Sequence, residues 1–418
     1  MRIACANWSR RHVGGIESYL QFVIPALQAL GHDVSFWSER DTPPERRPVP
    51  LPPNVATWCA EVEGLDMSLE ALRDWSPSVL FVHGLHEPRV EERLLDIAPA
   101  VLLAHSYYGT CISGGKTTRF PSTRPCGRVF GPACLAHFYP RRCGGLSPLT
   151  MVRDYRRQAS RLELLRRYDA VLTLSEHMRS EYVRHQAGER RAHRLPPYLP
   201  SGVCSTAVPT SGDQDARHVA RPRASEGIGR ATTLCFLGRI DVLKGLDVAI
   251  AALPRVHSAT ASGVHLIAAG DGPDRERCEH LAAAVRRKGA LDVTFTGWID
   301  ETERRQLFAQ ADVLVFPSLW PEPYGLTGLE AVMAGLPVAA FRTGGVTEWL
   351  RDGIDGALAP ADPPSADGLA DAIVRCIRTG RHAPWSPAII VDEQRRHVAA
   401  LASHLARAAD VRAGLVVA

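Results

Sequence analysis

Short apolar runs alternate with segments of helical periodicity along most of this chain. The runs are continuous rather than alternating, which is typical of strands buried on both faces of a sheet. A helix is predicted to begin near Ile16, directly after Gly14 and Gly15, and to end before Gly31. In the first half the predicted strands lie at 3–6, 34–37, 79–82, 101–104 and 170–174.

The second half repeats this pattern after a segment of different composition. Residues 201–230 are rich in Ser, Gly, Pro and Arg and poor in apolar residues, which indicates a linker or flexible insertion. The predicted strands that follow lie at 234–237, 264–268, 293–295, 313–316 and 338–341. The predicted helices lie at 246–256, 275–288, 303–309, 326–334 and 368–378.

Strands that alternate with crossover helices predict an α/β fold with two Rossmann-like, doubly wound parallel-sheet domains. We expect a first domain at 1–204, a linker or insertion at 205–231, a second domain at 232–392, and a C-terminal helix at 393–418 that crosses back to the first domain. Ligands of doubly wound sheets bind outside the carboxyl ends of the strands. Function is therefore expected on loops that face a cleft between the domains.

Composition narrows the class of protein. With 418 residues, of which 45% are hydrophobic and 22% charged, the chain is too long for a small binding module and too apolar for a disordered scaffold. Six widely separated cysteines argue against a secreted disulfide scaffold. The start of the chain lacks the apolar core of a signal peptide, and no run of apolar residues is long enough to span a membrane. These features predict a cytoplasmic protein.

Positive charge is concentrated in one segment. The net charge of the whole chain is +4, which is too small to mark a nucleic-acid binder. Residues 116–194, however, contain 17 Lys and Arg against 6 Asp and Glu. This segment is a solvated basic face, a contact with an anionic membrane surface on the inner face of the membrane, or an attractant for an acidic or phosphorylated acceptor. No nucleic-acid partner is expected.

Two glutamates mark the segment PEPYGLTGLEAVMAGLPVAAFRTGGVTE at 321–348. Pro323 keeps Glu322 extended on a loop. Glu330 falls inside the helix that is predicted to open after Gly325. The two carboxylates are therefore expected on different elements.

The start of that helix has backbone groups that suit an anion. The N–H groups of Leu326 and Thr327 have no acceptor in a preceding turn, and the helix dipole favours negative charge there. An anion flanked by two carboxylates that bind hydroxyl groups describes a sugar nucleotide. The alternative is a surface loop followed by an amphipathic helix with an ordinary glutamate in it.

Further candidates for phosphate binding follow other strands. Arg239 and Lys244 lie on the loop after the strand at 234–237, where two cations can stabilise a departing diphosphate and substitute for a metal. Gly14 and Gly15 leave room for a phosphate at the start of the first helix. The alternatives are solvated loop charges for the cations and a simple turn for the glycines.

Three histidines come just after predicted strands, at the edge where ligands bind. His105 is the best candidate for a contact with substrate, although a structural histidine at a strand end remains the alternative. His83 and His86 are expected to position the acceptor or a loop.

One cluster of cysteines interrupts a stretch rich in Gly, Pro and Arg that lacks apolar periodicity. The cluster has no close Cys-x2-Cys pair, so free thiols are favoured over a structural metal site or disulfide pairs. Its members are Cys111, Cys126, Cys134 and Cys143.

Several of these motifs, in this order, resemble the family 4 glycosyltransferases, which are retaining enzymes of the two-domain GT-B architecture. The resemblance covers most of the chain. It rests on Gly14-Gly15 with Glu17 and Tyr19, LGRIDVLKG at 237–245, AAGDGP at 268–273, FTGWID at 295–300, ADVLVFPS at 311–318 and the segment at 321–348.

The resemblance implies transfer of a sugar from a nucleoside diphosphate sugar to an acceptor hydroxyl, with no cofactor and no catalytic metal. It implies that His105 and Glu322 act at the transferred sugar, and that Glu330 binds the ribose. The base is expected near Gly297 and Trp298. The donor diphosphate is expected to contact Gly14, Gly15, Arg239, Lys244, Gly325, Leu326 and Thr327.

The acceptor stays open between a glycan, a lipid-linked molecule and a small natural product. The resemblance implies a front-face substitution, and no second acid is seen that is placed for a covalent intermediate. Alternative functions are an epimerase or a phosphorylase of the same fold, because a fold does not determine chemistry, or a non-catalytic sensor of sugar nucleotides.

Overall fold

The computed structural model describes residues 1–11, 14–43, 48–200, 231–287, 289 and 291–412. Its contacts divide the chain into two units. The first comprises Met1–Lys116, Gly127–Pro200 and Ile390–Ala418, and the second comprises Thr117–Cys126 and Ser201–Ile389. The predicted linker at 205–231 lies outside the described residues apart from Ala231.

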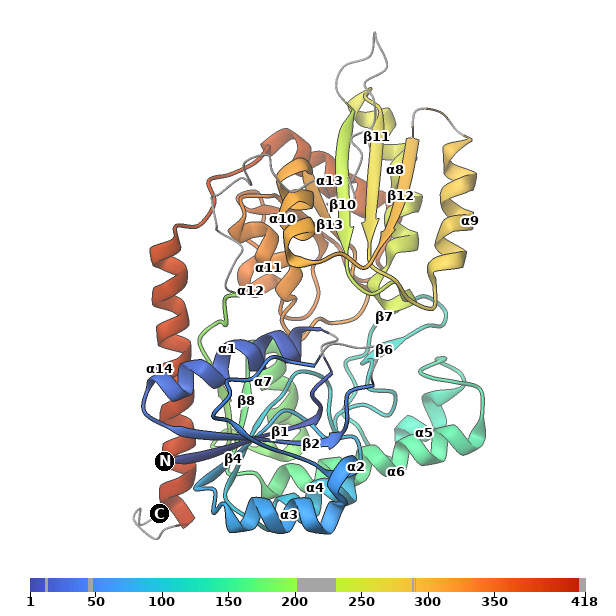
Figure 1. Cartoon of the computed structure of the whole chain (residues 1–418). Helices are drawn as coiled ribbons and strands as arrows, with labels where there is room; N and C mark the ends of the chain where they lie inside the picture. The colour runs from blue at the N-terminus through green and yellow to red at the C-terminus, as the bar shows by residue number, and fades with distance from the viewer. Residues whose placement is uncertain (12–13, 44–47, 201–230, 288, 290, 413–418) are drawn as a thin grey trace. The chain divides into compact units, whose positions relative to one another are not determined.

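The first unit is built on a parallel sheet (Figure 1), which has seven strands within the described ranges. The strand order is β3-β2-β1-β4-β5-β8-β9. Successive strands are added in one direction from β1 to β3 and in the other direction from β4 to β9. The turning point of the strand order therefore lies between the neighbouring strands β1 and β4, as in other doubly wound folds. The strands are β1 (Arg2–Ser9), β2 (Asp33–Arg40), β3 (Ala56–Cys59), β4 (Val79–Val82), β5 (Ala100–Leu103), β8 (Ala170–Thr173) and β9 (Ala192–Arg194).

Helices cover both faces of this sheet. Figure 1 shows α1 on one side of the strands and α3 and α4 on the other, as right-handed crossovers in opposite directions require. The helices of this unit are α1 (Gly15–Ala29), α2 (Ala60–Glu63), α3 (Leu65–Asp74), α4 (Pro88–Leu94), α5 (Ala133–Phe138), α6 (Pro148–Leu164), α7 (Glu176–Tyr182) and, from Ile390 on, α14 (Pro387–Arg412).

The second unit repeats the plan with a parallel sheet that has six strands in the part of the chain described. Its order is β12-β11-β10-β13-β14-β15, so the turning point lies between β10 and β13. The strands are β10 (Thr232–Leu237), β11 (Val264–Ala269), β12 (Leu291–Gly297), β13 (Val313–Phe316), β14 (Val338–Phe341) and β15 (Gly356–Ala359). A small antiparallel hairpin, β6 (Thr117–Thr118) and β7 (Arg124–Pro125), belongs to this unit as well.

A continuous apolar core joins one face of this sheet to three helices, α8, α9 and α13. Leu253, Cys278 and Ile373 belong to this core and are inaccessible to solvent. The opposite face contacts α10 and α11. The helices of the unit are α8 (Leu246–Thr260), α9 (Arg275–Arg286), α10 (Glu301–Gln310), α11 (Leu326–Met333), α12 (Val346–Trp349) and α13 (Ala366–Thr379).

The predicted fold class is confirmed, and most predicted elements lie within a few residues of the observed ones. The hairpin strands β6 and β7 were missed, and so were three strands of the two parallel sheets, whose sequences carry little apolar signal. β3 and β9 read ATWC and AHR, and β15 contains a glycine. The predicted domain bounds stay predictions, although Thr117–Cys126 groups with the second unit. None of the helices in the described ranges has the length and apolar character of a transmembrane span.

Candidate active site

The loops after β10 and β13 meet at the turning point of the second sheet. Lys244 follows β10 and Glu322 follows β13. The Nζ atom of Lys244 donates to Oε1 of Glu322 over 2.6 Å, and the Ser318 hydroxyl donates to the same oxygen over 2.7 Å. Glu322 is buried, so these two donors compensate its charge away from water. Its Oε2 atom keeps its acceptor capacity.

Glycines allow these loops to approach each other closely. Gly245 has a left-handed backbone (φ +67°), and a Cβ atom there would overlap the carbonyl oxygen of Pro317. Gly344 likewise lies against the backbone of Glu322, and the N–H of Gly345 donates to the Glu322 carbonyl over 2.8 Å. The position of the carboxylate is therefore set by backbone contacts from two neighbouring loops.

The start of α11 lies one turn beyond Glu322. Gly325 has φ +89°, a conformation that permits the chain to turn sharply into the helix. Trp349 supports this turn, since its indole donates to the Tyr324 carbonyl over 2.6 Å and its ring lies against Gly328.

The N–H groups of Leu326 and Thr327 precede the first intrahelical donors, which are those of Gly328 and Leu329. They are available to an anion, as expected for the first turn of a helix. The backbone at this position therefore has the geometry that the predicted anion site requires, and the site itself stays a prediction.

Glu330 lies further along α11 and is buried. Burial raises the pKa of its carboxyl group, and an ion pair with Arg304 of α10 acts in the opposite direction. Arg304 Nη1 donates to Glu330 Oε2 over 2.7 Å. Oε1 keeps its acceptor capacity, so this carboxylate can receive a hydrogen bond from a ligand hydroxyl.

Three further predicted residues lie at the carboxyl ends of β12 and β10, which flank β11 in the sheet. Gly297 ends β12 and has φ +77°, and its carbonyl accepts from the N–H of Gly270 over 2.7 Å. Trp298 follows with 60% of its surface exposed, which is unusual for so large an apolar side chain. Arg239 is exposed after β10, with Nε 3.7 Å from Asp241 Oδ2. The structure thus gathers all predicted second-unit residues on one edge of one sheet.

In the first unit, His83 and His105 follow β4 and β5. The Nδ1 atom of His83 and the Nε2 atom of His105 are 2.9 Å apart, and the rings stack with centroids 5.2 Å apart. Burial lowers the pKa of His105 to about 4 and lowers that of His83 well below its usual value. Both rings are therefore neutral at pH 7, and one donates to the other. His86 is separate from this pair, and its Nδ1 atom lies 3.2 Å from Oε1 of Glu87.

The histidine pair packs against Tyr19 of α1, which connects it to the C-terminal helix. His397 of α14 has Nδ1 2.8 Å from the Pro196 carbonyl and Nε2 2.7 Å from the Tyr19 hydroxyl. A carbonyl only accepts, so Nδ1 carries the proton, and the tyrosine donates to Nε2. This network attaches α14 to the carboxyl edge of the first sheet.

Gly14 and Gly15 lie at the start of α1, as expected. The Gly14 N–H donates to Oε2 of Glu17 over 2.9 Å in a capping box. That N–H group is therefore already engaged by a carboxylate, and it is the least suited of the predicted phosphate donors.

The cysteines of the predicted cluster are free thiols. The Cys111 sulfur accepts from the Lys116 N–H over 3.3 Å. Cys134 and Cys143 pack against a small apolar cluster around Phe138. Among the residues that the structure describes, no group of three or more His, Cys, Asp or Glu side chains is placed to hold a metal ion.

Four residues of these networks were not singled out from the sequence. Ser318, Arg304 and His397 contact Glu322, Glu330 and Tyr19, respectively. Trp320 lies with its ring 5.2 Å from Lys244 Nζ. The position of Ser318 and Trp320 just after a buried strand is a signal that could have found them. Nothing local marks Arg304 or His397, because their partners are distant in sequence.

Comparisons with known proteins agree with this arrangement. A family model described as glycosyl transferase 4-like domain matches residues 14–198, and one described as glycosyl transferases group 1 matches residues 231–379. Glycogen synthase of Mycobacterium tuberculosis is 28% identical over 89% of this chain and 85% of its own length. Alpha-D-kanosaminyltransferase of Streptomyces kanamyceticus is 28% identical over 64% of this chain and 66% of its own.

Solved structures show the same fold. The glycosyltransferase WaaG, involved in lipopolysaccharide biosynthesis, has a TM-score of 0.60 at 18% identity, covering 98% of this chain and 99% of its own. Anabaena Alr3699/HepE, in complex with UDP and glucose, has a TM-score of 0.57 at 14% identity. The match covers 99% of this chain and 98% of the HepE chain. The two family models together span most of the chain, one over each unit. This protein therefore belongs to the family 4 glycosyltransferases and is an enzyme of the GT-B fold.

Proposed function

We propose that this glycosyltransferase uses a nucleoside diphosphate sugar as donor and transfers the sugar to an acceptor hydroxyl with retention of configuration. The observation that carries the proposal is the meeting of Lys244, Glu322 and the start of α11 at the turning point of the second sheet. Ligands of doubly wound sheets bind at such points. A cation, a helix start and a carboxylate together suit a diphosphate joined to a sugar.

The leaving diphosphate gains negative charge as the glycosidic bond breaks. In the proposed site Lys244, Arg239 and the N–H groups of Leu326 and Thr327 stabilise that charge, which is electrostatic catalysis by preorganised donors. These groups supply the positive charge that a metal ion supplies in other enzymes, so we propose catalysis without a metal.

Two carboxylates then bind hydroxyl groups. Glu330 binds the ribose through Oε1, since Oε2 is held by Arg304. Glu322 binds a hydroxyl of the transferred sugar through Oε2, since Oε1 already accepts from Lys244 and Ser318. The exposed Trp298 offers a surface on which the base can stack.

We assign to His105 a contact with the transferred sugar. An uncharged imidazole does not repel the positive charge that develops on the sugar ring, and it can still hydrogen-bond to a sugar hydroxyl. His83 holds its ring in place. Retention follows if the acceptor attacks from the face that the diphosphate leaves, with the leaving phosphate accepting the acceptor's proton. HepE structures that contain UDP or UDP-glucose support this class of donor.

Thermal unfolding in the presence of nucleoside diphosphates and their sugars tests the donor. A ligand that binds only the folded protein raises Tm, by an amount equivalent to about 2.7 kcal/mol at one hundred times its Kd. We expect at least one nucleoside diphosphate sugar to do so, and free nucleoside diphosphate to accumulate only when an acceptor is present. If no nucleoside diphosphate sugar with any of the common bases raised Tm, the proposal would be contradicted. Release of nucleoside diphosphate in the absence of an acceptor would favour another reaction.

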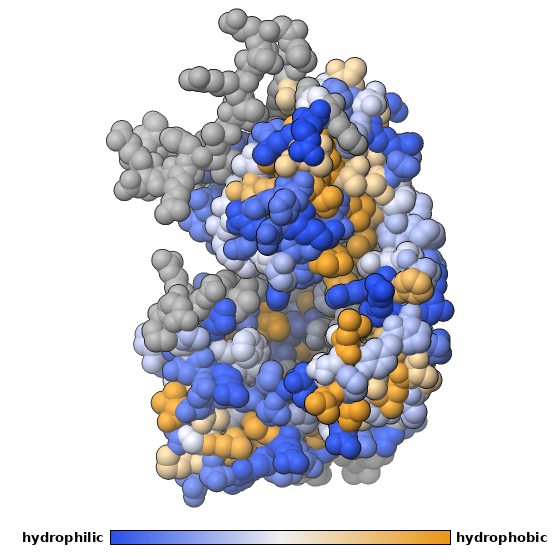
Figure 2. Space-filling view, turned by 90° about the vertical axis from the view of Figure 1, so that its right-hand side faces the viewer, coloured by the Kyte–Doolittle hydropathy of each residue, from blue (hydrophilic) through white to orange (hydrophobic). Residues whose placement is uncertain are grey.

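We further propose that the first unit contacts an anionic membrane surface, where a lipid-linked acceptor is presented. Leu146 and Leu149, at the start of α6, are 80% and 83% exposed. Arg153 is exposed one turn further along. Figure 2 shows apolar and hydrophilic side chains intermixed on the face of the first unit that carries α5 and α6. Apolar side chains among cations are typical of surfaces that bind anionic lipid.

Substitution of both leucines tests this contact. L146S/L149S is expected to reduce sedimentation with phosphatidylglycerol vesicles several-fold, because two inserted apolar side chains are lost. L281S, a substitution of a half-exposed leucine on α9, serves as control. Equal sedimentation of the double variant and the control would contradict the membrane proposal while leaving the donor proposal intact.

A further inference from the structure

A second cationic site lies in the first unit, at the edge of the sheet opposite to His105. The strands are parallel, so their amino ends meet at that edge. There, a cavity of about 500 Å³ is lined by the residues before β8, the residues before β9 and the later part of α14. This volume lies within the range of small-molecule sites.

Arginines dominate the lining of this cavity. Arg166 and Arg167 precede β8, Arg190 and Arg191 precede β9, and Arg407 comes from α14. Among the residues that the structure describes, the one carboxylate in the lining is Asp169, whose Oδ2 accepts from the Ala100 N–H over 2.9 Å.

Most of this positive charge is not neutralised by the protein. Arg167 donates to Asp96 over 2.5 Å. In the part of the chain that the structure describes, Arg190, Arg191 and Arg407 form no ion pair with a carboxylate. Like charges that converge on one cavity repel each other, and a bound anion would remove this cost.

The arginines are held by the backbone around them. Gly188 has φ +72°, and its carbonyl accepts from the N–H groups of Arg191 and Ala192, which forms a tight turn before β9. Arg191 Nη1 donates to the Arg166 carbonyl over 2.6 Å. Arg407 Nε donates to the Ser403 carbonyl over 3.3 Å. Such preorganisation lowers the entropy that binding has to overcome.

Two histidines complete the lining. The rings of His193 and His404 lie with centroids 4.7 Å apart, and Arg407 Nη2 is 3.1 Å from His404 Nδ1. Burial, together with neighbouring cations, lowers the pKa of both rings, that of His404 to about 4. Neutral His404 accepts from Arg407 at Nδ1, which leaves the N–H group at Nε2 to donate, whereas the N–H group of His193 is engaged by the Arg190 backbone.

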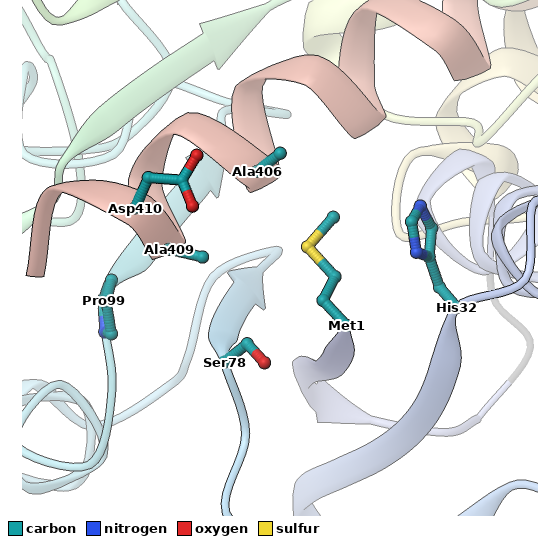
Figure 3. A pocket seen from close by; sticks show the side chains of 7 residues that line it. All are labelled: Met1, His32, Ser78, Pro99, Ala406, Ala409 and Asp410. Atoms are coloured by element: carbon teal, nitrogen blue, oxygen red, sulfur yellow. The ribbon is translucent and has the colours of Figure 1, made fainter. Parts of the chain in front are cut away.

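We propose that this cavity binds a small soluble phosphorylated molecule, at a site separate from the donor site. Arginine forks and the His404 N–H group match the oxygen atoms of a phosphate group. A second cavity at the same edge of the sheet lacks this concentration of positive charge. It has a volume of about 690 Å³, and its lining, which includes Met1, Ala406 and Asp410, contains no Arg or Lys among the described residues (Figure 3).

Titration calorimetry of the full chain with inorganic pyrophosphate tests the proposal. The donor site is also expected to hold a diphosphate, so the comparison is made in the K244A background. There R191Q/R407Q is expected to weaken the remaining binding at least tenfold, because two charge-assisted contacts are removed from exposed positions. R396Q is the matched control, since Arg396 is an exposed arginine of the same helix that pairs with Asp392. K244A, which removes a cation from the donor site, is expected to retain this binding.

Several results would overturn the inference. These are pyrophosphate binding by K244A/R191Q/R407Q within twofold of that by K244A, loss of all binding in K244A, or no saturable binding at millimolar concentration. Vesicles of anionic phospholipid provide a further arm. If their binding falls in R191Q/R407Q, the site takes a lipid headgroup and the assignment to a soluble ligand is wrong.

Discussion

Replacement of Lys244 by alanine is expected to reduce kcat by about 100- to 1,000-fold, the usual effect of removing one preorganised charge contact in a transition state. Lys244 is the cation that the structure holds against Glu322 at the turning point of the second sheet. Its charge matters most when the diphosphate departs, so kcat should fall more than KM rises. Steady-state kinetics with the donor identified by thermal unfolding gives both constants.

The loss in K244A has to be separated from unfolding and from a general loss of charge. R255A removes an exposed cation of α8 that pairs with Asp371, and it should leave kcat unchanged. K244A should unfold at a temperature close to that of the unaltered protein, because Ser318 still donates to Glu322. Unaltered kcat in K244A would rule out the proposed role of this lysine.

Replacement of Glu330 by alanine is expected to reduce kcat/KM by about 100-fold, mainly through a higher KM for the donor. One hydrogen bond from a ribose hydroxyl to Oε1 of this buried carboxylate would account for this loss, since such a bond contributes about 1.5–3 kcal/mol, and about 2.7 kcal/mol corresponds to 100-fold. Arg304 loses its partner in this variant, but its side chain is 22% exposed and can be hydrated.

Two controls make the Glu330 result specific. E330Q keeps the volume and one acceptor oxygen, so its kcat/KM should lie between those of E330A and the unaltered enzyme. E276A removes an exposed carboxylate from the first turn of α9 and should have no effect. The unaltered enzyme should bind the natural donor more tightly than a 2′,3′-dideoxy analogue of it, and E330A should lose this preference. If the ratio of the two affinities were the same in both proteins, the ribose assignment would be refuted.

The strands that carry the active-site loops were predictable because they are buried on both faces. β4, β13 and β14 consist of apolar residues alone, and the predicted ranges for β13 and β14 match the observed bounds. Of the four strands at the sheet edges, β12 was predicted, whereas β3, β9 and β15 were not. β3 and β9 bury fewer side chains, so their sequences carry little hydrophobic signal, and pairing with β2 and β8 makes them strands.

The placement of Lys244 and Glu322 on one edge could also be anticipated. Both follow apolar strands, and parallel strands bring their carboxyl ends to the same edge. The contact between the two side chains could not be anticipated, because it depends on the approach of two loops whose contacting residues are 78 positions apart in the sequence. That approach requires Gly245 and Gly344, each of which lies against a distant backbone.

The sequence by itself thus determined two parallel α/β domains, the glycosyltransferase family and the residues that would carry charge or bind hydroxyl groups. Periodicity and the order of motifs are local properties, and each can be read along the chain. The tertiary structure alone decided which partner each of those residues has, including the Glu330–Arg304 pair and the attachment of α14 through His397. It alone also brought arginines from three segments around one cavity. Such groupings depend on close packing of distant segments, which no local pattern of residues specifies.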